Sequence, residues 1–319
     1  MRELGPSADV PLVPSSFLAL SPQESALSTS RAVLVPVPYD GATSYRSGAR
    51  EGPSAIIAAS RQLEDYDAEL KDEPSRLGIH TYPEVEPHVG SPEAMAERVY
   101  QVVRPLIGAG KLVGVLGGDH SVAVGSVRAC VERYPDLSVL YLDAHADLRD
   151  EYQGSRYSHA CAARRIHEMA PPFDRLRTGP GQALVQAPLV QVGVRSLSVE
   201  ERQYIEAHRI PVTFWDPAPA AFRPQEVARL LSPHVYVSVD LDVFDPALMP
   251  AVGTPEPGGM AWEQVVGLLR AVAEERRIVG FDVVELCPRE GPTACAFTAA
   301  RLVYKLIGYA LLLGEQPSP

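Results

Sequence analysis

The stretch LSVLYLDAHADLRD (residues 137–150) decides how the rest of the chain is interpreted. It opens with six mostly apolar residues, β-branched and aromatic ones among them, which are typical of a buried strand. Two carboxylates and an imidazole follow where the strand ends: Asp143, His145 and Asp147. Alternate side chains of an extended segment point the same way, so these three can converge on one point. Carboxylate and imidazole are ligands of divalent cations, so the stretch predicts a metal site, although a solvated turn with one histidine and two acids is the simpler alternative.

Composition places the chain among ordinary globular proteins. At 319 residues, with 46% hydrophobic and 22% charged, it can form one large α/β domain or two small ones. The net charge of −11 disfavours a nucleic-acid or anionic-membrane partner and mildly favours cationic ones. The four cysteines form no Cys-x-x-Cys pair and fit a reducing cytoplasm. The N-terminus does not resemble a secretory signal, and the apolar segment 294–313 contains Arg301 and Lys305, so we interpret it as a core helix and not as a membrane span.

Apolar runs alternate with segments of helical period along most of the chain. The predicted strands are 32–37, 111–116, 137–142, 189–194, 211–214, 235–239 and 278–284. The predicted helices are 54–66, 91–107, 121–133, 158–169, 198–208, 224–231, 262–277 and 293–313. At least six strand-then-helix units in a row indicate a largely parallel sheet with helices on both faces. Two stretches show no sustained period, namely a Pro- and Ser-rich arm at 1–30 and a surface excursion at 171–188 with four prolines.

Three more strand ends carry chemically capable residues. His120 follows a strand in GGDHS, and Glu285 follows the strand 278–284. Asp240 and Asp242 share one face at the end of another strand. Ligands of open α/β sheets bind outside the carboxyl ends of strands, so one site can gather all of these residues with the first cluster. A calcium loop at 240–245 is the alternative for the second acidic cluster, but the central glycine of such a loop is missing.

Four carboxylates and two imidazoles are too many for one catalytic zinc, which usually has three protein ligands. Two cations about 3.5 to 4 Å apart can share bridging carboxylates, and they suit this count. Oxygen-rich ligation with some nitrogen favours manganese and leaves magnesium, iron and cobalt open. The candidate metal ligands are therefore His120, Asp143, His145, Asp147, Asp240 and Asp242.

The three motifs together resemble the ureohydrolase family of arginases and agmatinases. They are GGDHS (117–121), DAHAD (143–147) and SVDLDVFDP (238–246), and the likeness extends over residues 32–313. The stretch YDGATSYRSGAREGP (39–53) is similar to the substrate-access loop of agmatinases, although Glu51 stands where Phe is more usual. The resemblance implies an arginase-like three-layer αβα sandwich around a mostly parallel sheet of roughly eight strands. It further implies a single catalytic domain at 31–319, two manganese ions per subunit and a homo-oligomer, either a trimer or a hexamer.

The resemblance also implies roles for individual residues. Asp143 and Asp240 would bridge both cations, with His120 and Asp147 completing one site and His145 and Asp242 the other. The two cations would activate a water molecule that attacks the trigonal guanidinium carbon.

Further residues take their expected roles from the same resemblance. Glu285 would bind the guanidinium group, a planar pairing that suits a carboxylate. His159 would shuttle protons, so the expected catalytic residues are His159, Glu285 and Asp147. Asp119 would orient a neighbouring residue or bond the turn, and Thr254 and Glu256 belong to a loop beside the site, where Thr254 is a candidate substrate contact.

The substrate is predicted from the loop after DAHAD. Asp150 and Glu151 would repel a carboxylate and attract an amine, although Arg149 and Arg156 weaken the argument. This favours a small cationic substrate, agmatine, giving putrescine and urea. N1-aminopropylagmatine is the near alternative, followed by guanidinobutyrate, arginine and formiminoglutamate. A deacetylase-like amidohydrolase with a single zinc and a regulatory homologue without activity are the alternatives from other classes, but no expected ligand is missing here.

Overall fold

The computed structural model describes residues 12–169, 188–216 and 221–314. Within them, eight strands form one sheet in the order β2-β1-β3-β8-β7-β4-β5-β6, and every pairing is parallel. The strands are β1 Ala32–Val37, β2 Ile79–Thr81, β3 Leu112–Gly117, β4 Leu137–Leu142, β5 Leu189–Val194, β6 Val212–Phe214, β7 His234–Asp240 and β8 Arg277–Val284. The predicted parallel α/β sheet is confirmed.

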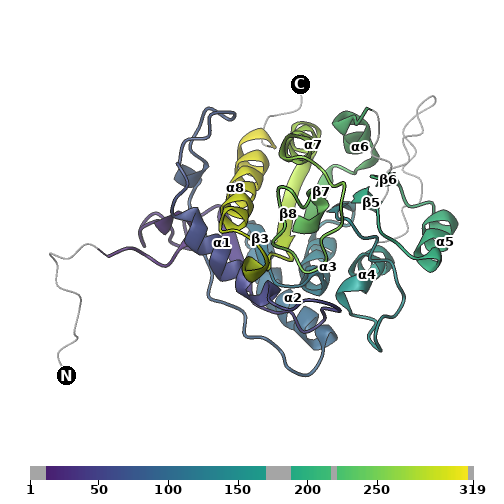
Figure 1. The fold of residues 1–319 in the computed structure, drawn as a ribbon. Coiled ribbons are helices and arrows are strands. Elements are labelled where there is room, and N and C mark those ends of the chain that lie inside the picture. The colour runs from purple at the N-terminus through teal and green to yellow at the C-terminus, as the bar shows by residue number, and fades with distance from the viewer. Residues whose placement is uncertain (1–11, 170–187, 217–220, 315–319) are drawn as a thin grey trace.

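Helices cover both faces of the sheet and make it the middle of three layers (Figure 1). They are α1 Gly52–Ser60, α2 Pro92–Gly108, α3 Ala123–Arg133, α4 Ala162–Met169, α5 Val199–His208, α6 Pro224–Leu230, α7 Trp262–Glu275 and α8 Ala294–Gly308. Side chains of α1, α6, α7 and α8 belong to the apolar core on one face, and those of α2, α3, α4 and α5 to the core on the other.

Strand β1 shows how the sheet is buried from both sides. Val33, Val35 and Val37 belong to the core beneath α2 and α3, and Ala32 and Leu34 to the core beneath α1 and α8. A parallel strand buried on both faces has no polar alternation, which is why its sequence is a continuous apolar run.

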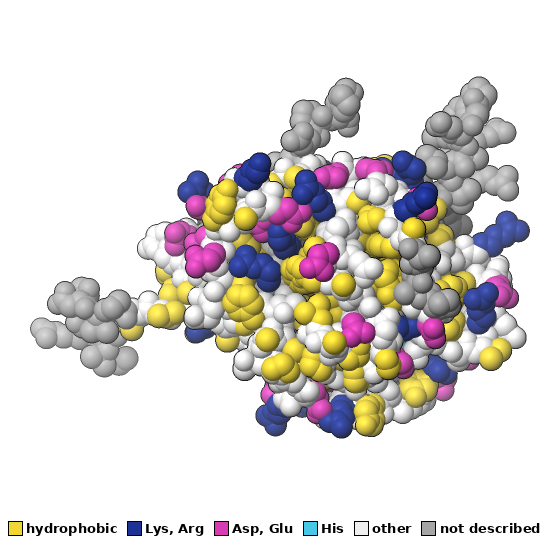
Figure 2. Space-filling view, turned by 45° about the horizontal axis from the view of Figure 1, so that its top comes forward, with side chains coloured by type: hydrophobic (Ala, Val, Ile, Leu, Met, Phe, Trp, Pro, Cys, Tyr) yellow, Lys and Arg dark blue, Asp and Glu magenta, His cyan; other side chains and the backbone are white. Residues whose placement is uncertain are grey.

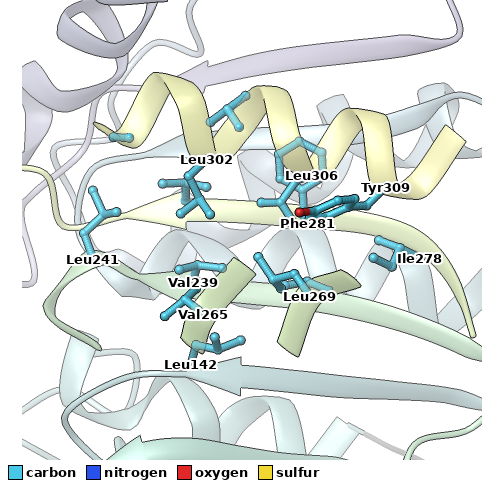
Figure 3. Packing of buried hydrophobic residues seen from close by; sticks show 14 of the residues in the cluster. Leu142, Val239, Leu241, Val265, Leu269, Ile278, Phe281, Leu302, Leu306 and Tyr309 are labelled. Atoms are coloured by element: carbon cyan, nitrogen blue, oxygen red, sulfur yellow. The ribbon is translucent and has the colours of Figure 1, made fainter. Parts of the chain in front are cut away.

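Helix α8 packs across the centre of the sheet and explains the most apolar segment of the chain. Leu302 and Leu306 of α8 lie over Phe281 of β8, and Leu269 of α7 lies beside them (Figure 3). All four are fully buried, and each such side chain contributes about 1.5–3 kcal/mol by leaving water. The segment Ala294–Leu313 is long and apolar enough to span a membrane by length and composition, yet 61% of its most apolar window is buried in the fold. This burial agrees with its interpretation as a core helix.

The structure departs from the predicted elements most clearly in three places. Helix α1 ends at Ser60 and not at 66, because the Ser60 hydroxyl bonds to Ile57 O at 2.7 Å and accepts the Leu18 N–H at 2.8 Å. Strand β2 was not predicted, since it is a three-residue edge strand inside a polar link. The final helix changes after Gly308 into a π-helical turn at Tyr309–Leu313.

The predicted N-terminal arm lies partly on the body of the protein. Phe17 is fully buried and packs with the core beneath α1, in a short 3₁₀ turn at Phe17–Ala19. Residues 1–11 of that arm lie outside the described residues. So does the predicted excursion at 171–188, apart from Pro188.

Charged side chains of both signs are interspersed with hydrophobic ones over the face drawn in Figure 2. No continuous basic stripe crosses that face.

Candidate active site

Four neighbouring strands at the centre of the sheet bring the predicted residues to one edge. Strands β3, β8, β7 and β4 lie side by side. His120 follows β3, Asp143 follows β4, Asp240 ends β7 and Glu285 follows β8. Because the strands are parallel, their carboxyl ends meet at the same edge. The structure brings these four residues together, as the sequence predicted.

His120 is fully buried, and carboxylates surround its Nδ1 atom. That atom lies 3.0 Å from Asp143 Oδ2, 3.2 Å from Asp240 Oδ2 and 3.6 Å from Asp147 Oδ2. One ring nitrogen therefore faces three carboxylates from two strand ends.

His145 forms a second group beside the first. Its Nδ1 atom lies 2.9 Å from Asp242 Oδ2 and 3.5 Å from Asp143 Oδ1. Asp143 thus faces a different histidine with each of its oxygens. The ligand atoms of each group lie within 4.8 Å of one another, the two groups being His120, Asp143, Asp147 and Asp143, His145, Asp242. Mixed oxygen and nitrogen donors at this spacing fit two divalent cations with Asp143 between them.

Buried carboxylates crowd this centre. Burial and then the charge of neighbouring carboxylates raise the pKa of Asp147 and Asp240 well above the usual range. At Asp143 burial acts in the same direction, but hydrogen bonds with His120 and His145 outweigh it and lower the pKa. A divalent cation among these groups would favour every carboxylate in its charged form, so the donor set fits such an ion on electrostatic grounds as well.

A chain of buried hydrogen bonds fixes the His120 ring from behind. Its Nε2 atom lies 2.8 Å from Ser238 Oγ, and the Ser238 hydroxyl donates to Asp282 Oδ1 at 2.8 Å. Since that hydroxyl hydrogen points to Asp282, the hydroxyl oxygen accepts from Nε2 and Nδ1 faces the carboxylates. Burial opposes protonation of His120, but these carboxylates raise its pKa, and a cation would compete with the proton for Nδ1.

Two of the site residues have left-handed backbone conformations. The φ angles are +52° at Asp147 and +65° at Glu285. Such a conformation costs a non-glycine residue on the order of 1–3 kcal/mol, and it persists only where neighbours hold it. The Arg164 N–H donates to Asp147 O at 3.0 Å, and the Glu285 N–H donates to Gly118 O at 2.7 Å. The fold therefore holds both carboxylates where the relaxed backbone would not place them.

Glu285 and His159 lie next to the two histidine groups. Glu285 Oε1 accepts the His120 backbone N–H at 2.9 Å and lies 3.9 Å from His159 Nδ1. Burial and the charge of Asp240 raise the pKa of Glu285 well above its usual range. Burial lowers the pKa of His159 to about 4, and its Nε2 lies 3.0 Å from Ser44 Oγ. Glu285, whose ionised form a cationic partner would stabilise, thus lies beside the neutral imidazole of His159.

A cavity of about 240 Å³ opens onto these groups. Thr254 is part of its wall, as the sequence predicted for a residue beside the site. The lining residues are Ser44, His145, Asp147, Arg149, Tyr152, His159, Ala160, Ser196, Leu197, Glu201 and Thr254.

The geometry does not support the predicted substrate contacts of Asp150 and Glu151. Neither residue is among those that line the cavity, whereas Arg149 and Tyr152 from the same loop are. Asp150 Oδ1 instead accepts bonds from Arg165 at 2.7 Å and Arg156 at 3.0 Å. Two guanidinium groups therefore neutralise Asp150, and Glu151 is exposed outside the cavity wall.

Sequence reasoning missed two residues that shape the site. Arg195 donates to Asp242 O and Glu256 O, each at 2.7 Å, and so ties the second acidic cluster to the loop beside the cavity. Ser44 brings the access loop to His159, and that loop is held by Asp119, whose Oδ2 accepts the Ala42 N–H at 2.8 Å. The only local signal for Arg195 is its position directly after a strand, which many arginines share.

Comparisons with known proteins give a consistent result. The sequence model of the arginase family matches residues 30–308. The N(1)-aminopropylagmatine ureohydrolase of Thermus thermophilus is 42% identical over 299 residues, covering 91% of this chain and 94% of that protein. The agmatinase of Pyrococcus horikoshii is 35% identical over 279 residues, covering 86% and 90%. The crystal structure of the agmatine ureohydrolase of Thermoplasma volcanium matches with a TM-score of 0.80 at 28% identity, covering 94% and 95%.

Proposed function

The chain belongs to the arginase family of ureohydrolases, and on this premise we propose that it hydrolyses the guanidino group of a linear guanidino amine. In this reaction the substituted guanidinium ion and water give urea and a free ammonium ion. The observation that carries the proposal is the position of Asp143 between two groups of candidate metal ligands, with the Glu285 carboxylate beside them.

The substrate we propose is N1-aminopropylagmatine, with agmatine second. The Thermus thermophilus relative that carries the first name is 42% identical, and the Pyrococcus horikoshii agmatinase is 35% identical. Agmatine was the substrate predicted from the sequence, and both amines undergo the same reaction. Both carry a cationic tail, which suits an acidic protein with a net charge of −11.

We propose two manganese ions as the resident cations. His120 and Asp147 would hold one, His145 and Asp242 the other, and Asp143 and Asp240 both. Manganese fits an oxygen-rich donor set that also contains imidazole. Bound there, two divalent cations supply Lewis-acid activation of a water molecule at neutral pH.

Glu285 orients the guanidinium ion in this proposal. Burial raises the pKa of its carboxyl group, so ionisation of Glu285 depends on a cationic partner, which the guanidinium supplies. A planar guanidinium against a planar carboxylate gives a two-bond contact and presents the central carbon in a fixed direction. The backbone N–H of His120 holds Oε1 from the other side at 2.9 Å.

Proton transfer falls to Asp147 and His159. The Asp147 carboxylate, whose pKa is raised, takes the proton that the attacking water releases. The amine leaves only after its nitrogen is protonated, and His159 donates that proton from the cavity wall, with Ser44 holding the far side of its ring. The lowered pKa of about 4 keeps His159 neutral at rest, so it takes up the proton that Asp147 received from water before it gives that proton to the amine.

We expect the protein to act in the cytoplasm as a homo-oligomer, a trimer or a hexamer. Four buried cysteines without disulfides support a reducing compartment. The oligomeric state follows from the family resemblance alone and is tested by light scattering of the purified protein.

The test is urea release by the manganese-loaded protein. We expect the highest kcat/KM with N1-aminopropylagmatine, a lower value with agmatine, and lower values again with arginine and guanidinobutyrate. Elemental analysis should give two manganese ions per chain. A preference for arginine, or one zinc ion per chain with no urea released from any guanidine, would contradict the proposal.

A further inference from the structure

The reaction proposed above does not use Glu256, a carboxylate next to the site. Its Oε1 atom lies 3.9 Å from Nε2 of His145, and its side chain is 37% exposed. On the opposite side of the same ring, Nδ1 of His145 lies 2.9 Å from Asp242. Glu256 does not itself line the cavity, but it lies about one imidazole width beyond Asp242 across the His145 ring, which does line it, and its side chain is partly open to solvent.

The loop that carries Glu256 also reaches the other end of the site. A methyl group placed on Gly253 would lie 3.9 Å from Oε2 of Glu285, so the start of the loop lies against the guanidinium-binding carboxylate. Glu256 comes three residues later, a stretch that spans at most about 10 Å when fully extended. An extended four-carbon chain separates a guanidinium carbon from the next nitrogen by about 6 to 8 Å, which fits within this reach.

Hydrogen bonds fix this loop, so the position of Glu256 is defined. The Arg195 guanidinium donates to Glu256 O at 2.7 Å and to Pro257 O at 3.0 Å. Asp245 Oδ2 accepts the N–H groups of Gly258 and Gly259 at 3.0 and 3.1 Å. A charge on a fixed backbone loses less conformational entropy on binding a ligand than a charge on a mobile loop.

Other acids near the site already have partners. Asp150 accepts bonds from Arg156 and Arg165. Glu201 accepts the Leu148 N–H at 3.0 Å, and it also bonds to both the backbone N–H and the hydroxyl of Ser198. In the described ranges, by contrast, no lysine or arginine pairs with the Glu256 carboxylate, which faces the His145 ring instead.

We infer that Glu256 binds the ammonium group four carbons away from the guanidine of the substrate, and so selects decarboxylated guanidino amines over arginine. The inference rests on the proposed function. The primary ammonium of agmatine and the secondary ammonium of N1-aminopropylagmatine stand at the same position along the chain. Arginine carries a carboxylate next to that nitrogen, and the Glu256 carboxylate would repel it.

A structural role would make a different prediction. If Glu256 only held the His145 ring through Nε2, its loss would weaken metal binding and slow every guanidine substrate equally. 1-Butylguanidine separates the two roles, because it has the guanidine and the four-carbon chain of agmatine without the ammonium group.

The experiment compares agmatine with 1-butylguanidine in the manganese-loaded parent and in Glu256→Gln. We expect kcat/KM for agmatine to fall about two- to five-fold, as for loss of a partly exposed charge pair, while the value for 1-butylguanidine stays the same. Glu256→Asp, which keeps the charge on a shorter side chain, should lie in between. Glu151→Gln is the matched control, because it removes one exposed negative charge from a different loop, whereas Glu256 lies 3.9 Å from His145. Raising the salt concentration should reduce the parent's preference for agmatine over 1-butylguanidine, since ions screen the pair.

Two results would overturn the inference and leave the proposed function standing. One is an unchanged ratio of agmatine to 1-butylguanidine turnover in Glu256→Gln. The other is an equal loss for both substrates together with weaker manganese binding in a titration followed by electron paramagnetic resonance. If the parent releases urea from neither agmatine nor N1-aminopropylagmatine, the proposed function fails and the role of Glu256 fails with it.

Discussion

Replacing Arg195 by lysine should loosen two loops of the active site at once. The guanidinium of Arg195 donates to backbone carbonyls on both loops, and three of its bonds are 3.0 Å or shorter, to Asp242, Glu256 and Pro257. Longer bonds reach Gly193, Val243 and Phe244. The Arg195 side chain therefore fixes the backbone position of both Asp242, a candidate metal ligand, and Glu256, the inferred ammonium acceptor.

The expected loss follows from these bonds. Lysine keeps the charge but offers a compact ammonium in place of a planar fork with five N–H donors, so it cannot reach both loops together. A hydrogen bond from a charged donor contributes about 1.5–3 kcal/mol. With two short bonds lost and a reduction for the partial exposure of Arg195, the free energy of unfolding should fall by about 2–3 kcal/mol. For a chain of 319 residues this lowers Tm by about 3–5 °C.

Calorimetry of the metal-free protein measures the stability, and steady-state kinetics with agmatine measures the function. Arg195→Lys should raise KM for agmatine and weaken binding of one manganese ion more than the other, because Asp242 serves the His145 group alone. Arg202→Lys is the control, since Arg202 makes an exposed pair with Glu206 and its loss should change Tm little. A Tm and a KM equal to those of the parent in Arg195→Lys would refute the argument that this residue fixes the two loops.

Three further predictions concern the metal centre, the Glu285 carboxylate that would bind the guanidinium ion, and the buried Lys305. Asp143→Ala should lose both manganese ions and Asp147→Ala mainly one, because Asp143 belongs to both ligand groups. If elemental analysis shows that the two variants lose equal amounts of manganese, Asp143 does not bridge the two ions. Glu285→Gln should keep both ions yet lose most turnover, roughly a hundred-fold or more for a desolvated charge pair, and near-normal urea release would remove Glu285 from the site. Lys305→Met removes the ammonium group that lies 2.8 Å from Asp67 Oδ1 and leaves this buried carboxylate unpaired. The free energy of unfolding should therefore fall by about 3 kcal/mol. Adding Asp67→Asn should recover part of this loss in a double-mutant cycle. Although burial opposes it, hydrogen bonds from Lys305 and Tyr309 lower the pKa of Glu69, so the part of the Lys305→Met deficit that comes from the Lys305–Glu69 pair should be full above about pH 4.5 and shrink as the pH falls through the folded pKa.

Local pattern was enough to predict the framework. Each long strand is an apolar run buried on both faces, so its composition alone separates it from the helices. His120, Asp143 and Asp240 were predicted to meet because each stands at a strand end, and parallel strands end at one edge. Strand β2 escaped prediction because three residues are too few to show a period.

Contacts between segments far apart in the chain could not be predicted from the sequence. Arg195 bonds to carbonyl groups, which every residue has, so no side-chain pattern marks its partners. Asp150 was expected to face the substrate, but two arginines neutralise it, one of them Arg165 on α4. The left-handed backbone conformation of Asp147 could not be predicted from the sequence either, since glycine is the residue that usually marks such a conformation.

The order of the strands has a consequence for how the protein is made. Strands β3 and β4 follow one another along the chain, yet β8 and β7 lie between them in the sheet. During synthesis β3 and β4 leave the ribosome before β7 and β8, together with His120 and Asp143. The edges of β3 and β4 that face each other stay unpaired until residues 234–284 have been made and pair with them. Asp240 and Glu285 arrive only with those later strands. A nascent chain stalled before residue 234 therefore has neither a continuous sheet nor Asp240 and Asp242, so two of the six candidate metal ligands are missing until these strands are made.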